Sequence, residues 1–210
     1  MTPPLRDPRA GEQWSRAPAK IALVGLRGSG KTTIGALLAN ELQRPFADLD
    51  RELERAFASS LPSDPSRPAA PPLRAGEILA HLGEAEFRTL EARVLLEVLG
   101  RPGPLVLACG GGVVLREENR ARLCEVAWVV WLDAPDAELA RRLAADPTPR
   151  PPLTHEGQRA GPASLQEIAA VRAERQRFYE EVAQLRIRTE GLLPPQVASL
   201  LRSGLGSAQA

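Results

Sequence analysis

The sequence predicts an α/β fold in which a parallel sheet is covered by helices on both sides. Short apolar runs rich in β-branched residues, such as 21–26 and 105–109, are typical of strands buried on both faces. These runs alternate with segments whose apolar residues recur every three or four positions, which is the period of a helix. Because all strands of such a sheet point the same way, ligands are expected beyond their carboxyl ends.

The length and composition are those of one globular domain. The 210 residues have a mass of 22.6 kDa, with 43% hydrophobic and 25% charged residues, which argues against a wholly disordered or fibrous chain. The net charge of +1 excludes a global field that would draw the chain onto nucleic acid or a membrane surface. We therefore expect no nucleic-acid partner and no membrane partner, and any recognition of anions must be local.

Signals for export or membrane insertion are not expected. No apolar run reaches the ~18 residues of a membrane span, and residues 1–18 contain no hydrophobic stretch typical of a signal peptide. The two cysteines, Cys109 and Cys124, lie in apolar surroundings that predict core positions, without zinc-site spacing or the density of a disulfide scaffold. These features predict a cytoplasmic protein.

The first third of the chain predicts two strand-helix units and a break. Residues 1–18 are rich in Pro and Arg and predict a flexible tail. Residues 59–73 are dense in Pro and Ser, which support neither a helix nor a strand ladder, and predict an exposed insertion. The elements expected between these segments are a strand at 21–26, a helix at 31–42, a strand at 46–50 and a helix at 51–58.

The remaining chain continues the alternation to residue 203, where the predicted domain (19–203) ends and a flexible C-terminus (204–210) begins. Gly100 and Pro102 mark the end of one helix, and Pro135 is well placed in the first turn of another. The loop that follows residue 145 is rich in proline and is expected to be mobile. Strands are expected at 105–109, 126–132 and 186–189, and helices at 75–81, 84–99, 116–124, 135–144, 165–185 and 195–201.

Residues 25–32 match the phosphate-loop pattern G-x-x-x-x-G-K-[ST]. In this pattern the glycines turn backbone N–H groups toward phosphate oxygens, Lys31 reaches the β and γ oxygens, and Thr32 offers a hydroxyl to Mg²⁺. Only two of the 27 basic side chains are lysines, so a lysine inside a motif is informative. A plain glycine-rich turn is the less favoured alternative, because the required strand and helix flank the pattern. The predicted nucleotide-binding residues of the loop are Gly28, Ser29, Gly30, Lys31, Thr32 and Thr33.

Two carboxylates, Asp48 and Asp50, end the second predicted strand. Strand alternation points both to the same side, about 7 Å apart along the chain. One could hold a metal-bound water while the other meets a hydroxyl group. The alternative is that Asp50 caps a helix and Asp48 is merely solvated, but a neighbouring phosphate loop favours the chemical interpretation.

Three consecutive glycines, Gly110, Gly111 and Gly112, follow the third predicted strand. Without side chains, their peptide N–H groups could approach a ligand closely, although a flexible loop is the alternative. Arg150 lies in the proline-rich loop, where a closing lid could bring its guanidinium onto a transferring phosphate. Composition alone does not distinguish the other arginines from solvated surface charges.

Taken in order, six segments resemble the shikimate kinase family over residues 20–203. They are GLRGSGKTTIG at 25–35, DLD at 48–50, GEAEFR at 83–88, GGG at 110–112, RPPL at 150–153 and ERQRFYEEVA at 174–183. The resemblance implies a P-loop NTPase fold of nucleoside-monophosphate-kinase type, with a five-stranded parallel sheet, a small substrate-binding region (44–90) and a lid (146–163). It also implies transfer of the ATP γ-phosphate to the 3-hydroxyl of shikimate, a step of aromatic amino acid (chorismate) biosynthesis, by a monomer.

The resemblance assigns roles at the acceptor end of the site. Asp50 holds the accepting hydroxyl and takes its proton, while Arg88 and Arg175 clamp the substrate carboxylate. The backbone of residues 110–112 touches the sugar-like ring. Two arginines suit this task because guanidinium groups bind a carboxylate in a bidentate manner.

At the nucleotide end, the resemblance assigns Thr32 to Mg²⁺ directly and Asp48 to Mg²⁺ through water. Arg141 flanks adenine, with Arg142 as the alternative. Lys31 and Arg150, together with Asp50, form the predicted catalytic set, because phosphoryl transfer depends mainly on positioning and charge neutralisation. The insertion at 59–73, a longer lid and RPPL in place of the more usual RPLL are departures from the family pattern.

Two other functions remain open at this point. One is a kinase of the same architecture that acts on another small alcohol such as gluconate, which has less reason to keep DLD, EFR and GGG together. The other is a catalytically silent module that senses a metabolite. The presence of Lys31, Thr32, Asp50 and Arg150 argues against the silent module.

Overall fold

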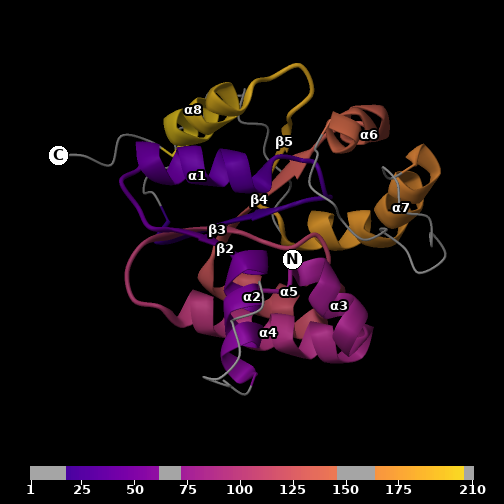
Figure 1. The fold of residues 1–210 in the computed structure, drawn as a ribbon. Coiled ribbons are helices and arrows are strands. Elements are labelled where there is room, and N and C mark those ends of the chain that lie inside the picture. Colours follow the sequence, from indigo (N-terminus) through magenta and orange to yellow (C-terminus); the bar gives the residue numbers. More distant parts are fainter. Residues whose placement is uncertain (1–17, 62–71, 146–163, 206–210) are drawn as a thin grey trace.

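The computed structural model describes residues 18–61, 72–145 and 164–205 (Figure 1). Within these residues, five parallel strands form one sheet in the order β2-β3-β1-β4-β5, which confirms the predicted sheet. The strands are β1 (Lys20–Val24), β2 (Phe46–Asp48), β3 (Leu105–Ala108), β4 (Trp128–Asp133) and β5 (Leu185–Arg188).

Helices cover both faces of the sheet. Figure 1 shows α1 and α8 on one face, with α2, α3, α4 and α5 on the other. The helices are α1 (Lys31–Glu41), α2 (Leu49–Ser60), α3 (Ala75–Leu82), α4 (Glu84–Gly100), α5 (Glu117–Val126), α6 (Asp136–Ala145), α7 (Leu165–Val182) and α8 (Pro194–Gly204), with a short 3-10 helix, η2 (Val113–Leu115). Among the described residues, no helix has the length and apolar character needed to span a membrane.

The alternation of side chains along β1 explains why this strand lies at the centre. Ile21 and Leu23 are fully buried against α1 and α8, while Ala22 and Val24 belong to the core formed with α4, α5 and α7. A strand that is apolar on both faces can be satisfied only between two helical layers. A third, smaller cluster joins α2, α3 and α4 through Leu53, Phe57, Ile78 and Phe87.

Most element boundaries differ from the predictions by one to three residues, and three of these differences have a clear structural cause. β2 ends at Asp48 rather than residue 50, because the Asp48 side chain caps α2, which begins at Leu49. β4 starts at Trp128 rather than residue 126, since α5 extends to Val126. α7 ends at Val182, so that β5 begins at Leu185 in register with Val130 of β4.

The two cysteines do not share an environment. Cys109 is buried, as predicted, but the core position expected for Cys124 is wrong, because this side chain is exposed. The helix α5 buries the preceding Leu123, and neighbouring helical positions point about 100° apart. Cys124 is therefore turned outward.

Several predicted segments lie wholly or mostly outside the described residues. These are the tail (1–18), the insertion (59–73), the lid (146–163) with Arg150, and the C-terminus (204–210).

Candidate active site

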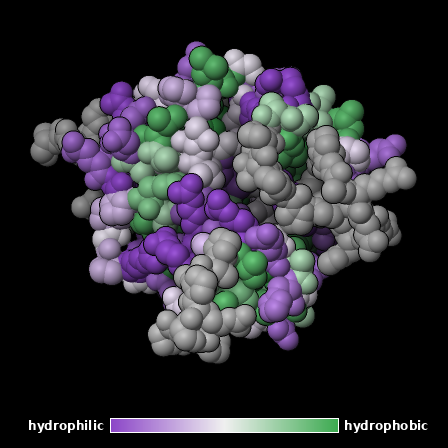
Figure 2. All heavy atoms as spheres, viewed as in Figure 1, coloured by the Kyte–Doolittle hydropathy of each residue, from purple (hydrophilic) through white to green (hydrophobic). Residues whose placement is uncertain are grey.

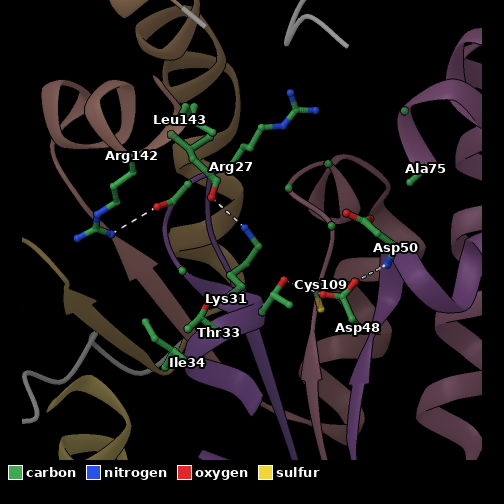
Figure 3. A pocket seen from close by; sticks show the side chains of 18 of the residues that line it. Arg27, Lys31, Thr33, Ile34, Asp48, Asp50, Ala75, Cys109, Arg142 and Leu143 are labelled. Carbon is green, nitrogen blue, oxygen red and sulfur yellow. Dashed lines mark hydrogen bonds between the residues drawn. The ribbon is translucent and has the colours of Figure 1, made fainter. Parts of the chain in front are cut away.

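A cleft with a volume of about 790 Å³ lies at the carboxyl ends of the central strands. Its walls come from the phosphate loop after β1, the start of α2, the glycine loop after β3, and parts of α3, α4, α6 and α7. Figure 3 shows Lys31 and Arg142 on one side, with Asp48 and Asp50 facing them. This is the edge of the sheet at which the sequence predicts a ligand.

The phosphate loop requires glycine at defined positions. Gly25, Gly28 and Gly30 have φ angles of 140°, 84° and 93°, a region that residues with a side chain rarely adopt. In addition, a Cβ atom at Gly25 would collide with the carbonyl oxygen of Leu132 on β4. The loop therefore packs closely against β4 and ends at the N-terminus of α1. The helix dipole favours an anion at this position.

Lys31 is already turned into this loop. Its Nζ donates hydrogen bonds to the carbonyl oxygens of Gly25 (2.9 Å) and Leu26 (2.8 Å). Loss of hydration lowers the pKa of Lys31 to about 8, although Asp50 and Asp48 oppose this shift. The ammonium group is therefore held next to the cradle by weak neutral acceptors.

The hydroxyl residues of the loop differ in exposure. Thr32 and Thr33 are exposed and line the cleft. Ser29 is 1% exposed, and its Oγ has no hydrogen-bond partner in the described part of the chain. Of the predicted loop residues, Ser29 is thus the one whose side chain is buried in the loop itself.

Asp48 connects the phosphate loop with α2. Its Oδ2 accepts a hydrogen bond from Thr32 Oγ1 at 2.7 Å, and its Oδ1 accepts from the backbone N–H groups of Asp50 (3.1 Å) and Arg51 (3.3 Å). The capping residue is therefore Asp48, and the alternative in which Asp50 is the cap is wrong. Because a cap of this kind contributes about 1 kcal/mol, Asp48 has a structural role in addition to any chemical one.

The Asp50 carboxylate takes no part in capping α2 and lines the cleft instead. Its side chain is exposed there, but the surrounding protein removes much of its hydration. This loss of hydration and the charge of Asp48 raise the pKa of Asp50, while Lys31 and Arg27 act in the opposite direction. The result is a carboxylate of increased basicity opposite the phosphate loop.

A magnesium ion fits the oxygen donors of Thr32 and Asp48, which already meet. Among the described residues, no three His, Cys, Asp or Glu side chains form a group that could hold a metal ion by themselves. This combination suits Mg²⁺, which keeps several waters and usually takes one or two protein oxygens together with phosphate oxygens.

Two of the three glycines in the glycine loop lie so close to side chains of the site that a Cβ atom would displace them. A Cβ atom at Gly110 would lie 2.8 Å from Asp50 Oδ1 and 3.1 Å from Glu91 Oε1. At Gly112, a Cβ atom would lie 2.5 Å from both terminal nitrogens of Arg88. Gly111 differs, because a Cβ there would make only ordinary contacts of 3.6 Å or more. Polar side chains of the site therefore close directly onto the backbone of this loop.

Arg88 and Glu91 form a pair on α4. Arg88 Nη1 donates to Glu91 Oε2 at 2.9 Å, and Glu91 is only 2% exposed. Burial raises the pKa of Glu91, whereas Arg88 lowers it. The sequence predictions missed Glu91. The available signal was its place in the apolar stripe of α4, where Phe87 and Val94 are also buried, because an acidic residue in such a stripe requires a partner.

Three further predicted arginines, which lie on α6 and α7, also line the cleft. Arg175 projects from α7 with its side chain 14% exposed and its Nε 3.3 Å from Glu174. Arg141 is mostly exposed and pairs with Glu138 at 2.8 Å. Arg142 is more firmly held, because it donates to the carbonyl oxygen of Thr189 (2.9 Å) and lies 3.4 Å from that of Gly28.

An apolar end of the cleft was not predicted. It is formed by the segment between β5 and α8, where Leu192, Leu193 and Pro194 line the cleft near Arg142. Leu193 is 66% exposed. Exposed apolar side chains next to arginines form a surface suited to a flat ring.

The geometry can now be compared with known proteins. The family model described as shikimate kinase matches residues 27–64 and 71–204. The chain belongs to the shikimate kinase family. A shikimate kinase from Symbiobacterium thermophilum is 40% identical over 170 residues, which are 81% of this chain and 86% of the relative. One from Rhodopirellula baltica is 37% identical over 175 residues, which are 82% of each chain.

Solved structures agree with this family. The shikimate kinase from Acinetobacter baumannii, solved in complex with shikimate, superposes with a TM-score of 0.73 at 32% identity, covering 90% of this chain and 93% of that one. A gluconokinase from Sinorhizobium meliloti gives a TM-score of 0.53 at 17% identity, covering 90% and 93%, and shares the fold alone. The predicted family and the predicted P-loop kinase fold are confirmed.

Proposed function

We propose that this member of the shikimate kinase family phosphorylates the 3-hydroxyl of shikimate with ATP, producing shikimate 3-phosphate and ADP. The observation that carries this proposal is the single cleft in which a phosphate loop faces Asp50, Arg88 and Arg175. The family match spans both sides of that cleft. The reaction belongs to aromatic amino acid biosynthesis, and we propose a cytoplasmic monomer.

The phosphate loop is the proposed site of the ATP phosphates. The backbone of residues 28–33 and the N-terminus of α1 supply N–H groups and a favourable dipole. Lys31 would exchange its two carbonyl acceptors for phosphate oxygens, which form stronger, charge-assisted hydrogen bonds. Arg141 and the apolar end of the cleft are the proposed surroundings of the adenine, with Arg142 bracing the loop.

Thr32 and Asp48 are the proposed protein ligands of Mg²⁺, Thr32 directly and Asp48 through water. When bound, the ion neutralises charge on the β- and γ-phosphates. The hydrogen bond between these two side chains brings their oxygens to the same place. Asp48 is further restrained by its cap of α2, which limits how far the site can relax.

The acceptor alcohol is proposed to lie against Asp50. The raised pKa of Asp50 makes this carboxylate a better acceptor for the hydroxyl proton. Because Asp50 and Lys31 act on each other electrostatically, the acceptor and donor ends are coupled. The acceptor oxygen is thereby held toward the phosphate loop, which is the positioning that phosphoryl transfer requires.

Arg88 and Arg175 are the proposed partners of the substrate carboxylate, and the backbone of Gly110, Gly111 and Gly112 is the proposed surface for the ring. Glu91 orients Arg88, and the two arginines come from different helices. A ligand held by both is fixed in orientation as well as bound. Arg150, outside the described residues, is proposed to bring a further positive charge from the lid onto the transferring phosphate.

A substrate panel with a coupled ADP readout tests the function. Purified chain with Mg-ATP is expected to release ADP on addition of shikimate, with the phosphorylated acid identified by mass spectrometry. Gluconate and quinate serve as alternative acceptors in the same assay. Turnover of gluconate without turnover of shikimate would reject the proposal, and binding of shikimate without ADP release would favour a silent sensing module.

A further inference from the structure

Three side chains of α7 form one stripe, whose middle member, Arg175, lines the cleft. Arg172, Arg175 and Tyr179 are separated by three and four positions, so they lie on the same side of the helix. Arg175, the proposed partner of the substrate carboxylate, lies between the other two. Its position depends on how the helix is fixed on either side of it.

The first attachment is to the end of β4. Arg172 donates to Asp133 Oδ1 at 2.8 Å, to Asp136 Oδ1 at 2.6 Å and to the carbonyl oxygen of Ala134. Asp133 is 7% exposed and accepts a further hydrogen bond from Arg186 of β5 at 2.7 Å. This network ties α7 to the sheet, independently of the glycine loop.

The second attachment is Tyr179, the only tyrosine of the chain. Its ring is buried and stacks on Trp131 of β4, with centroids 5.8 Å apart and an interplanar angle of 26°. Its hydroxyl donates a 2.6 Å hydrogen bond to the carbonyl oxygen of Gly111. The ring therefore belongs to the core, and the hydroxyl is the part that reaches the glycine loop.

This hydrogen bond ties α7 directly to the glycine loop. A second, indirect tie reaches the segment after the loop, because Arg120 pairs with Glu181 of α7 and donates to the carbonyl oxygens of Val114 and Leu115. Gly111 lies between Gly110, where a Cβ atom would meet Asp50 and Glu91, and Gly112, where it would meet Arg88. Arg175 lies one helical turn before Tyr179. Glycine residues restrict the backbone least, so a loop of three glycines needs an external contact to hold one conformation.

We propose that Tyr179 is a positioning residue, whose hydroxyl holds the glycine loop in register with Arg175 and thereby orders the acceptor end of the site. This proposal rests on the proposed function. Gly111 also lies next to the phosphate loop, since a Cβ there would be 3.6 Å from the Gly25 carbonyl oxygen, but that loop has a further tie through Arg142. Removal of the hydroxyl should therefore affect the two substrates unequally.

Tyr179→Phe is the test variant, because it keeps the stacked ring and removes only the hydroxyl. The matched control is Glu180→Gln on the same helix, which changes an exposed side chain whose carboxylate accepts a 2.8 Å hydrogen bond from Gln176 of α7 itself. We expect Tyr179→Phe to raise the KM for shikimate by about tenfold, with the KM for ATP changed less than about twofold. Glu180→Gln should leave both KM values near those of the wild type.

Amide hydrogen exchange of residues 110–112 in the ligand-free protein gives a readout that needs no activity. Exchange is expected to be faster in Tyr179→Phe and unchanged in Glu180→Gln, at temperatures where both remain folded. Equal KM shifts for both substrates, or unchanged exchange, would overturn the positioning role. Absence of shikimate turnover in the wild type would instead reject the proposed function, and the exchange measurement would still decide on the contact.

Discussion

The two ends of the cleft are built in different ways. At the nucleotide end, eight consecutive residues, 25–32, form the loop, and its shape follows from local backbone conformation, with three glycines at positive φ. At the acceptor end, α2, α4, the glycine loop and α7 each contribute, and no two predicted residues from different elements are close in sequence. The first end is a local motif, whereas the second exists only once the chain is packed. Substitutions at the two ends should therefore have different effects on the kinetics and stability of the protein.

The largest effect is expected at the nucleotide end. Lys31→Ala should lower kcat by about 10³-fold or more, because the charge that meets the transferring phosphate is lost. The fold should survive, since Lys31 contributes only two hydrogen bonds within its own loop. Steady-state kinetics together with circular dichroism check this, and near-normal turnover would contradict the role of Lys31.

The acceptor end has an equivalent test in Asp50→Asn, which keeps the shape and removes the charge. We expect kcat to fall about 10² to 10⁴-fold, the usual range for a general base, while the affinity for ATP is largely kept. Isothermal titration with a non-hydrolysable ATP analogue separates the two effects. Unchanged turnover would leave neither a base nor a charged hydroxyl anchor at Asp50.

The glycine loop offers a comparison within three consecutive residues. Gly112→Ala should lower kcat/KM for shikimate by about 10² or more, because the new Cβ would displace the Arg88 guanidinium. Gly111→Ala has room for the methyl group. In this variant kcat/KM for shikimate should change only a few-fold, because the substrate-binding groups stay in place. Similar losses in both variants would show that the flexibility of the loop, and not the close approach of Arg88, is what matters.

The pH dependence should differ for the two substrates. As pH rises through about 8, Lys31 in the nucleotide-free protein loses its proton, so kcat/KM for ATP should fall on the alkaline side. As pH falls through the raised pKa of Asp50 in the ligand-free protein, the carboxylate gains a proton, so kcat/KM for shikimate should fall on the acidic side. Lys31→Arg should remove the alkaline fall. An alkaline fall that persists in that variant would assign it to another group.

The smallest effect is expected at the two neighbouring arginines of α6. Arg142→Ala should raise the KM for ATP by about tenfold and lower Tm, because Arg142 joins the phosphate loop to Thr189. Arg141 is itself 70% exposed and pairs with Glu138 of its own helix, so Arg141→Ala should raise the KM for ATP about threefold through lost contact with the base, with Tm unchanged. Equal effects on Tm would show that both arginines brace the loop.

The sequence was sufficient for those features that depend on neighbouring residues. The phosphate loop, the parallel sheet and most helices follow from local patterns and were predicted. Glu91 was missed because its partner, Arg88, was identified only by family resemblance, and Tyr179 was missed because an aromatic residue in an amphipathic helix is typical of a core. Cys124 was misplaced because an apolar neighbourhood in sequence does not determine which way a helical residue points.

By itself, the order of motifs predicted a nucleotide-binding loop and determined to which family of kinases the chain belongs. Only the tertiary structure decided which carboxylate caps α2 and which faces the cleft, and that a side chain at Gly110 or Gly112 would displace Asp50 or Arg88. The physical reason is that dihedral preferences and hydrophobic periodicity act over a few residues. Contacts such as that of Tyr179 with Gly111 join residues 68 positions apart and form only when the helices pack on the sheet.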